Sequence, residues 1–319
     1  MKYIEVGKSG VKASNLIMGC MRLKGKTPTE AEKMIRTALE EGINYFDHAD
    51  VYGSAGHRGE CEEIFGKAVD LMDPSIREKM IIQGKCGIVK GEVGAYDFSK
   101  EHILEATDGI LKRLHTEYLD FLLLHRPDTL VEPEEVAEAF EILHTQGKVR
   151  HFGVSNHKPM QVELLQKYVP FKLEVNQLQL SIAHSLMIDS GIAANMDIAQ
   201  GYDKEGSVLE YSRLRDMTIQ AWSPFQQSGF VSSSHANPFL GDMEHFGKLN
   251  EVIRRLAQKY EVTDTAIAVA WITRHPANIQ VILGTMNPQR MKDACKGSDI
   301  PLTRSEWYEL YQAAGKRLP

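Results

Sequence analysis

The segment FDHADVYG, residues 46–53, places two aspartates, a histidine and a tyrosine directly after a short apolar run. The phenol of Tyr52 can supply a proton, and the carboxylate of Asp47 can accept hydrogen bonds or balance a cation. Turns after strands also favour Asp, His and Gly, so a plain polar turn is the alternative interpretation. The choice between a turn and an active site depends on the residues at the ends of the other apolar runs.

Two further runs end in residues that can carry out acid–base chemistry. Lys85 ends the run IIQGK, where a buried ammonium without a partner is costly, so we expect Asp47 on the neighbouring strand to pair with it. His125 ends the run YLDFLLLH. A hydrogen-bonded structural histidine is the alternative to a catalytic one at this position.

The sequence shows no pattern of metal ligands. His48, Asp50 and His57 are close together but lack a regular ligand spacing, so no metal site is expected. The cysteines form no C-x-x-C pair and are expected to be reduced thiols; they are Cys20, Cys61, Cys86 and Cys295.

These candidate residues lie at the ends of predicted strands that alternate with amphipathic helices. Strands are predicted at residues 16–19, 44–47, 80–84, 119–124, 149–154, 173–176, 218–222 and 279–283. Eight βα units in about 300 residues predict an α/β fold of the (β/α)8 TIM-barrel type, in which chemistry lies at the C-terminal ends of the strands. A doubly wound Rossmann sheet is the competing fold, but the chain has no G-x-G-x-x-G loop.

Local signals place several element boundaries. Capping residues predict helix starts at 27–30, 287–288 and 303–306. The turn signal at 7–10 predicts an N-terminal β-hairpin that closes the bottom of the barrel. Without a repeat or a Pro/Ser-rich linker, residues 1–319 are expected to form a single domain.

The bulk composition excludes several classes of partner. Apolar residues make up 43% and charged residues 25% of the chain, which is typical of a globular protein. The net charge of -6 argues against nucleic acid or an anionic membrane as a partner. The first residues lack the apolar core of a secretory signal, so a cytoplasmic location is expected. Nothing in the sequence indicates a particular oligomeric state.

Seven motifs occur in order along nearly the whole chain: INYFDHADVYG, IIQGK, LDFLLLHRPD, GVSN, VNQ, AWSPF and ILGTMNPQR. Together they resemble the aldo-keto reductase superfamily. This resemblance implies a (β/α)8 barrel and a nicotinamide cofactor bound without a Rossmann fold. It also implies a catalytic tetrad of Tyr52, Lys85, His125 and Asp47.

The resemblance implies the reduction of an aldehyde or ketone with NADPH, NADH being the poorer cofactor. Tyr52 would donate the proton that the developing alkoxide needs. A free phenol has a pKa of about 10, and Lys85 is expected to lower it for Tyr52. Asp47 would keep Lys85 charged, and His125 would orient the carbonyl oxygen.

The same resemblance implies the cofactor-binding residues. The nicotinamide carboxamide would contact Ser155, Asn156 and Gln177, and the nicotinamide ring would stack on Trp222, where many members have tyrosine. The pyrophosphate loop would comprise Ser223, Pro224, Phe225, Ser228 and Gly229. The adenosine 2′-phosphate would be held by Arg290, Thr285 and the backbone N–H of Met286, and Gly284 and Asp293 are expected among the cofactor-binding residues. Some members have a lysine where this chain has Gly284.

The residues also allow two alternative functions, a Schiff-base aldolase and a non-catalytic regulatory subunit. Lys85 could form a Schiff base in an aldolase, but GVSN, VNQ and AWSPF would then have no purpose. A non-catalytic, cofactor-binding regulatory subunit of a channel is the other alternative, and the intact tetrad disfavours it. Substrate-pocket walls are expected from Met21–Arg22, Cys86, residues 96–98 and the long connection 181–206.

Overall fold

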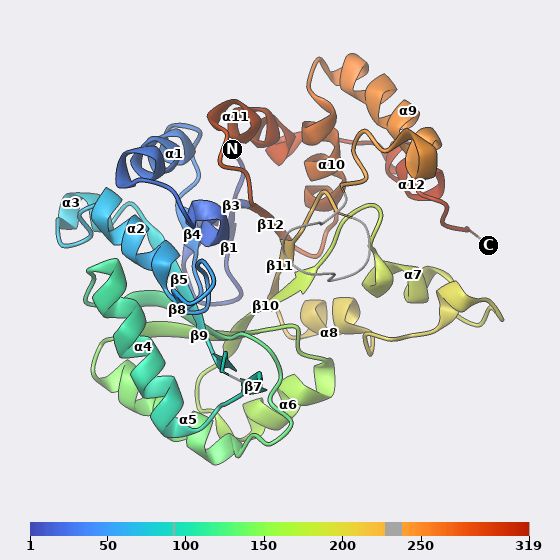
Figure 1. The fold of residues 1–319 in the computed structure, drawn as a ribbon. Helices are drawn as coiled ribbons and strands as arrows, with labels where there is room; N and C mark the ends of the chain where they lie inside the picture. Colours follow the sequence, from blue (N-terminus) through green and yellow to red (C-terminus); the bar gives the residue numbers. More distant parts are fainter. Residues whose placement is uncertain (92, 227–237, 319) are drawn as a thin grey trace.

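A computed structural model describes residues 1–91, 93–226 and 238–318 of the chain. Its centre is a closed barrel of parallel strands, ordered β10-β11-β12-β3-β4-β5-β8-β9 (Figure 1). The barrel strands are β3 (Leu16–Gly19), β4 (Tyr45–Asp47), β5 (Ile81–Cys86), β8 (Leu119–Leu124), β9 (Val149–Ser155), β10 (Leu173–Gln179), β11 (Thr218–Trp222) and β12 (Gln280–Leu283). The predicted TIM barrel is confirmed.

Helices surround the barrel because each connection between consecutive barrel strands returns along its outer face (Figure 1). The α-helices are α1 (Pro28–Glu40), α2 (Glu60–Ala68), α3 (Pro74–Arg77), α4 (Lys100–Leu114), α5 (Pro133–Thr145), α6 (Pro159–Tyr168), α7 (Leu186–Ile192), α8 (Val208–Leu214), α9 (Met243–Tyr260), α10 (Asp264–Thr273), α11 (Pro288–Cys295) and α12 (Arg304–Ala313). Short 3₁₀ helices in the described part of the chain are η1 (Cys20–Leu23), η2 (Ala199–Gly201) and η3 (Lys296–Asp299).

Two hydrophobic clusters hold these layers together. The larger cluster fills the space between the barrel and the helices. The smaller cluster lies inside the barrel, and the residues Val6 and Ala13 belong to it. Val6 and Ala13 come from an antiparallel hairpin of β1 (Tyr3–Glu5) and β2 (Lys12–Ser14). The predicted hairpin therefore closes the barrel, because its apolar side chains complete the interior cluster.

The predicted helix starts agree with the structure. Thr27 and Glu30 form a capping box at the start of α1, and Thr303 and Glu306 form another at the start of α12. Asn287 caps α11 by accepting a hydrogen bond from the backbone N–H of Arg290. A small hairpin of β6 (Ile88–Val89) and β7 (Ala95–Tyr96), between β5 and α4, was not predicted.

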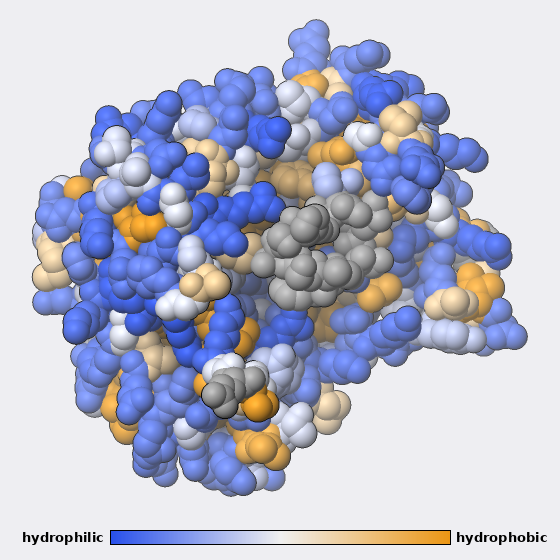
Figure 2. All heavy atoms as spheres, in the orientation of Figure 1, coloured by the Kyte–Doolittle hydropathy of each residue, from blue (hydrophilic) through white to orange (hydrophobic). Residues whose placement is uncertain are grey.

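The surface of the barrel assembly is predominantly polar. Figure 2 shows hydrophobic residues scattered singly or in small groups among hydrophilic ones on the face drawn. This distribution arises from the amphipathic helices, which turn their apolar sides to the barrel. Among the described residues, no helix combines the length and the apolar character that crossing a membrane requires.

Candidate active site

Three neighbouring strands carry the four residues of the predicted tetrad. Asp47 is the last residue of β4, and Tyr52 lies in the turn after it. Lys85 lies near the end of β5, and His125 comes directly after β8. The backbone N–H of His125 donates to the carbonyl of Cys86 at 2.9 Å, which fixes the end of β8 against β5. All four residues thus reach the C-terminal end of the barrel, where parallel strands place catalytic groups.

The side chains of these residues are in contact. Lys85 Nζ lies 2.5 Å from Asp47 Oδ1, and both residues are buried. The same ammonium lies 5.0 Å from the centre of the Tyr52 ring. The rings of Tyr52 and His125 meet edge to face with centroids 5.9 Å apart. The structure therefore brings together a phenol, a cation paired with a carboxylate, and an imidazole.

The pKa values in this site differ from the expectation for the tyrosine. Burial raises the pKa of Tyr52 well above its ordinary value, and the negative charge of Asp47 raises it further. The net lowering of the pKa of Tyr52 that was expected from Lys85 is therefore not found in this structure. The negative charge of Asp47 offsets the positive charge of Lys85, and the desolvation of a Tyr52 phenolate outweighs the attraction to Lys85 that remains.

The pKa shifts of the other two ionisable groups have simple physical causes. Burial lowers the pKa of Lys85, and Asp47 opposes that effect through its charge and its hydrogen bond. Burial lowers the pKa of His125 well below its ordinary value, and the positive charge of Lys85 adds to the shift. His125 is therefore a neutral imidazole at neutral pH.

The predicted nicotinamide-binding residues are adjacent to this cluster. Ser155 Oγ donates to the carbonyl of Gln177 at 3.0 Å, and Asn156 Nδ2 donates to Ser155 Oγ at 2.8 Å. Asn156 has a φ of 62°, a left-handed conformation that Asn tolerates better than most residues. Trp222 Nε1 donates to Asn156 Oδ1 at 3.1 Å, while Asn156 Nδ2 also reaches the carbonyl of His125 at 3.3 Å. Hydrogen bonds through the Asn156 amide thus join the indole of Trp222 to the backbone of His125.

The predicted phosphate-binding residues lie around the start of α11. Thr285 Oγ1 accepts a hydrogen bond from the N–H of Asn287 at 3.1 Å, and Met286 packs against the hydrophobic core. Arg290 is exposed in the first turn, and its side chain forms no ion pair with the described residues. Asp293 accepts a hydrogen bond from Gln289 at 3.0 Å, so its carboxylate is engaged within the helix.

A second cation lies beside Gly284. The Nε and Cζ atoms of Arg22, on η1, lie 3.9 and 4.0 Å from the position that a Cβ on Gly284 would take. The arrangement arises because β3, which leads into η1, pairs with β12, which leads into Gly284. Arg22 was expected in the pocket wall, and the structure places its guanidinium at the C-terminal end of β12, on the side of the barrel where the tetrad lies.

The predicted pyrophosphate loop is only partly described. Ser223 adopts a left-handed φ of 55°, Pro224 is buried, and Phe225 packs against the core. Ser228 and Gly229 lie outside the described residues.

The expectation that Cys86 and Phe98 line the substrate pocket is wrong. Cys86 and Phe98 have relative exposures of 0% and 1%, because their side chains belong to the hydrophobic core. Met21 and Tyr96 are exposed at 41% and 48% and remain candidates for the wall. In the connection 181–206, Met187 is buried in the core, which favours helix packing over a substrate contact.

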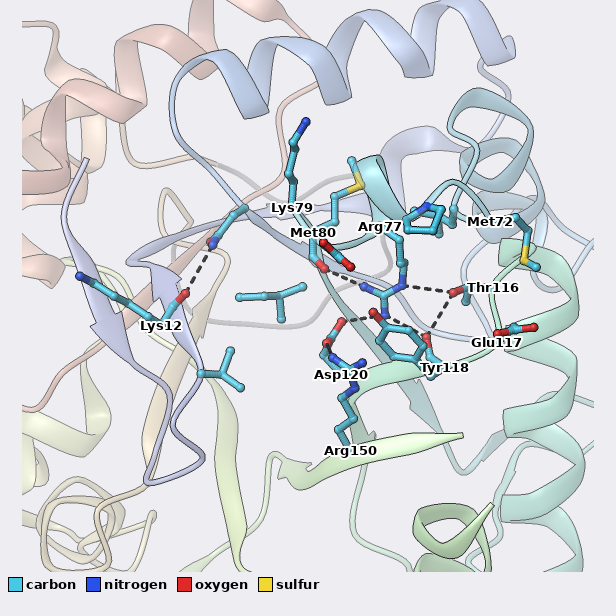
Figure 3. A pocket seen from close by; sticks show the side chains of 16 residues that line it. Lys12, Met72, Arg77, Lys79, Met80, Thr116, Glu117, Tyr118, Asp120 and Arg150 are labelled. Carbon is cyan, nitrogen blue, oxygen red and sulfur yellow. Dashed lines mark hydrogen bonds and ion pairs between the residues drawn. The ribbon is translucent and has the colours of Figure 1, made fainter. Parts of the chain in front are cut away.

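A cavity of about 500 Å³ lies at the opposite end of the barrel, where the strands begin. Arg77 crosses its wall (Figure 3) and donates to Thr116 Oγ1, to the carbonyls of Met80 and Tyr118, and to Asp120. The guanidinium also lies 3.7 Å from the centre of the Tyr118 ring. These contacts use four of the five N–H donors of the buried arginine, and none of them involves the tetrad. We therefore assign this wall a structural role.

Metal binding finds no support in the described parts of the chain, where no group of three or more His, Cys, Asp or Glu side chains is arranged to hold an ion.

Comparison with known proteins defines the class of this barrel. The model of the aldo/keto reductase family matches residues 15–314, so the chain belongs to that family and is an oxidoreductase. It is 31% identical over 322 residues to the oxidoreductase YdhF of Escherichia coli (strain K12), covering 98% of each chain. It is also 31% identical to a 6-dehydroglucose reductase of Novosphingobium aromaticivorans, covering 99% of this chain and 97% of that one.

A solved structure supports the fold. The thermostable aldo-keto reductase Tm1743, determined with the inhibitor epalrestat, superposes with a TM-score of 0.74 at 23% identity and covers 98% of this chain and 100% of its own.

Proposed function

We propose that this protein reduces aldehydes or ketones to alcohols with NADPH, and that Tyr52 donates the proton. The observation that carries the proposal is the contact between Tyr52, His125 and the Lys85–Asp47 pair at the C-terminal end of the barrel. A bound nicotinamide would supply the hydride to the carbonyl carbon.

The side chains of Tyr52, Lys85 and His125 would each have a separate role in the reduction. A phenol with a raised pKa stays protonated at neutral pH and gives up its proton only when a stronger base, the alkoxide oxygen, forms. The ammonium of Lys85 beside the ring then stabilises the phenolate. The neutral imidazole of His125 can donate one hydrogen bond to the carbonyl oxygen and orient it.

The residues near His125 fit a nicotinamide. Trp222 offers an aromatic face, and the groups of Ser155 and Asn156 can match the donor and acceptor of a carboxamide. Gln177 can offer its Oε1 as an acceptor, because both hydrogens of its Nε2 go to Gln220 and Asp47. The guanidinium groups of Arg22 and Arg290 are exposed along the end of β12 and the start of α11. They suit the phosphates of an extended dinucleotide, and the N-terminus of α11 favours the same charge. We therefore propose that all of these residues hold the cofactor.

Purified protein should oxidise NADPH when a reactive aromatic aldehyde, a dicarbonyl or a sugar aldehyde is added. The sugar aldehyde belongs in the panel because similar proteins are 6-dehydroglucose reductases. Loss of NADPH absorbance with formation of the matching alcohol is the measurement. Borohydride added with a carbonyl substrate should trap no adduct on Lys85; a trapped adduct would instead indicate a Schiff-base aldolase. Cofactor binding without turnover of any carbonyl would indicate the non-catalytic role.

Replacing Arg290 by alanine should weaken NADPH binding by about tenfold or more and leave NADH binding nearly unchanged. Only NADPH carries the 2′-phosphate, and a charge-assisted hydrogen bond contributes about 1.5–3 kcal/mol. Fluorescence titration of each cofactor measures the two affinities without turnover. Lys292→Ala removes a charge from the last turn of the same helix and is the control.

An equal loss for both cofactors would show that Arg290 contacts the adenine ring rather than the 2′-phosphate. No loss for either would place the phosphate elsewhere.

A further inference from the structure

Four glutamines project into the barrel behind the tetrad and form what we call the amide layer. Its members, one on each of four strands, are Gln83, Gln177, Gln220 and Gln280. Their relative exposures are 0%, 3%, 0% and 0%. Buried amides require hydrogen-bond partners, so the identity of those partners indicates what the layer does.

The hydrogen bonds of the amide layer run in one consistent direction. Gln280 Nε2 donates to the carbonyl of Ser14 at 2.8 Å, and Gln220 Nε2 donates to Gln280 Oε1 at 3.1 Å. Gln220 Oε1 in turn accepts from Gln83 Nε2 at 2.9 Å and from Gln177 Nε2 at 3.1 Å. Each of those two nitrogens has one further hydrogen to donate.

Both remaining hydrogens go to the same carboxylate oxygen. Asp47 Oδ1 accepts from Gln83 Nε2 at 2.6 Å and from Gln177 Nε2 at 3.0 Å, in addition to Lys85 Nζ at 2.5 Å. The hydroxyl of Tyr45 donates to Gln83 Oε1 at 2.8 Å, which fixes the orientation of that amide. If the Gln83 amide were turned around, its NH2 group would face the Tyr45 hydroxyl and its oxygen would face the Asp47 carboxylate.

Gln83 makes the shorter of the two amide contacts with Asp47 and lies two residues before Lys85 on the same strand. A buried carboxylate needs donors beyond its ion-pair partner to remain in one position. We propose that Gln83 is a positioning residue, which holds Asp47 and thereby fixes the Lys85 ammonium against the ring of Tyr52. This proposal rests on the proposed reductase function.

Gln83→Met keeps the length of the side chain and removes both donors, so it tests the proposal directly. We expect kcat to fall by about tenfold or more with little change in the KM for cofactor, because positioning acts on the transition state. Gln280→Met is the matched control: it removes a glutamine that is also fully buried in the amide layer but does not touch Asp47. Its kcat should stay within about twofold of the unmodified protein.

A second readout needs neither cofactor nor substrate. In protein with isotope-labelled lysine, the Lys85 ammonium signal, assigned with Lys85→Met, should shift in Gln83→Met and not in Gln280→Met. If Gln83→Met fails to fold, Tyr45→Phe removes the hydroxyl that orients the Gln83 amide, and the signal should shift in that variant.

An unshifted Lys85 signal, or equal kcat losses in the Gln83 and Gln280 variants, would overturn the proposal and leave the layer a purely structural role. If the unmodified protein reduces no carbonyl, the proposed function fails, while the Lys85 signal still shows whether Gln83 positions the ion pair.

Discussion

Replacing Tyr52 by phenylalanine is expected to lower kcat for carbonyl reduction by at least about 100-fold. The ring stays in place against His125 and Lys85, but the only proton that the side chain can give is lost. Cofactor affinity should remain within about twofold, because the loss concerns the transition state rather than binding. Steady-state kinetics and cofactor titration on the same preparation measure both quantities.

Tyr308→Phe is the control for the Tyr52 variant, since Tyr308 is an exposed tyrosine on α12, far along the chain from the tetrad. It should leave kcat unchanged. If Tyr52→Phe retains more than about a tenth of the normal kcat, another group donates the proton.

The largest effect on stability is expected from Arg77→Met, at about 3–5 kcal/mol of the free energy of unfolding. The arginine is 4% exposed and pairs with Asp120 at 2.8 Å, so its loss leaves this buried carboxylate with the longer ion pair to Arg150 at 3.3 Å. Asp120 also accepts from the backbone N–H of Ile82 at 2.8 Å, which couples the pair to β5. Urea denaturation measures the change.

Arg36→Met is the matched control for Arg77→Met. Arg36 pairs with Glu32 on the surface of α1, where its side chain is 67% exposed. Such pairs contribute about 1 kcal/mol or less. If Arg77→Met lowers the free energy of unfolding by as little as this, solvent replaces the contacts of the Arg77 guanidinium. Folded Arg77→Met protein should keep its kcat, because Arg77 lies at the opposite end of the barrel from the tetrad.

The sequence predicted the barrel well because its strands are short apolar runs separated by clear helix caps. Capping residues such as Thr27 and Asn287 act within one helical turn, so local patterns are sufficient to place them. The β6–β7 hairpin escaped prediction because each of its strands has only two residues, too few to show an alternating pattern.

Contacts that join distant strands were harder to predict. Gln83 and Tyr45 each precede a tetrad residue by two positions, and strand alternation places both on the inner face of the barrel. That signal was present, but Gln220, the partner of Gln83, comes from a strand more than a hundred residues away. The position of Arg22 beside Gly284 likewise depends on the pairing of the first and last barrel strands.

The direction of the pKa shift of Tyr52 could not be read from residue types either. A neighbouring lysine lowers the pKa of a phenol in the open, but burial beside Asp47 raises it here. Motifs identify which groups meet, whereas burial decides which of their effects is larger.

The amide layer also determines how protons can reach the site. Glutamine side chains neither gain nor lose a proton near neutral pH, so a series of hydrogen bonds between them cannot relay a proton. The series of hydrogen bonds from Asp47 through Gln83, Gln220 and Gln280 to the carbonyl of Ser14 is therefore polar but does not transfer protons. In the proposed reaction, a proton that Tyr52 gives to its product has to be replaced from the mouth of the barrel, the same side through which substrate enters.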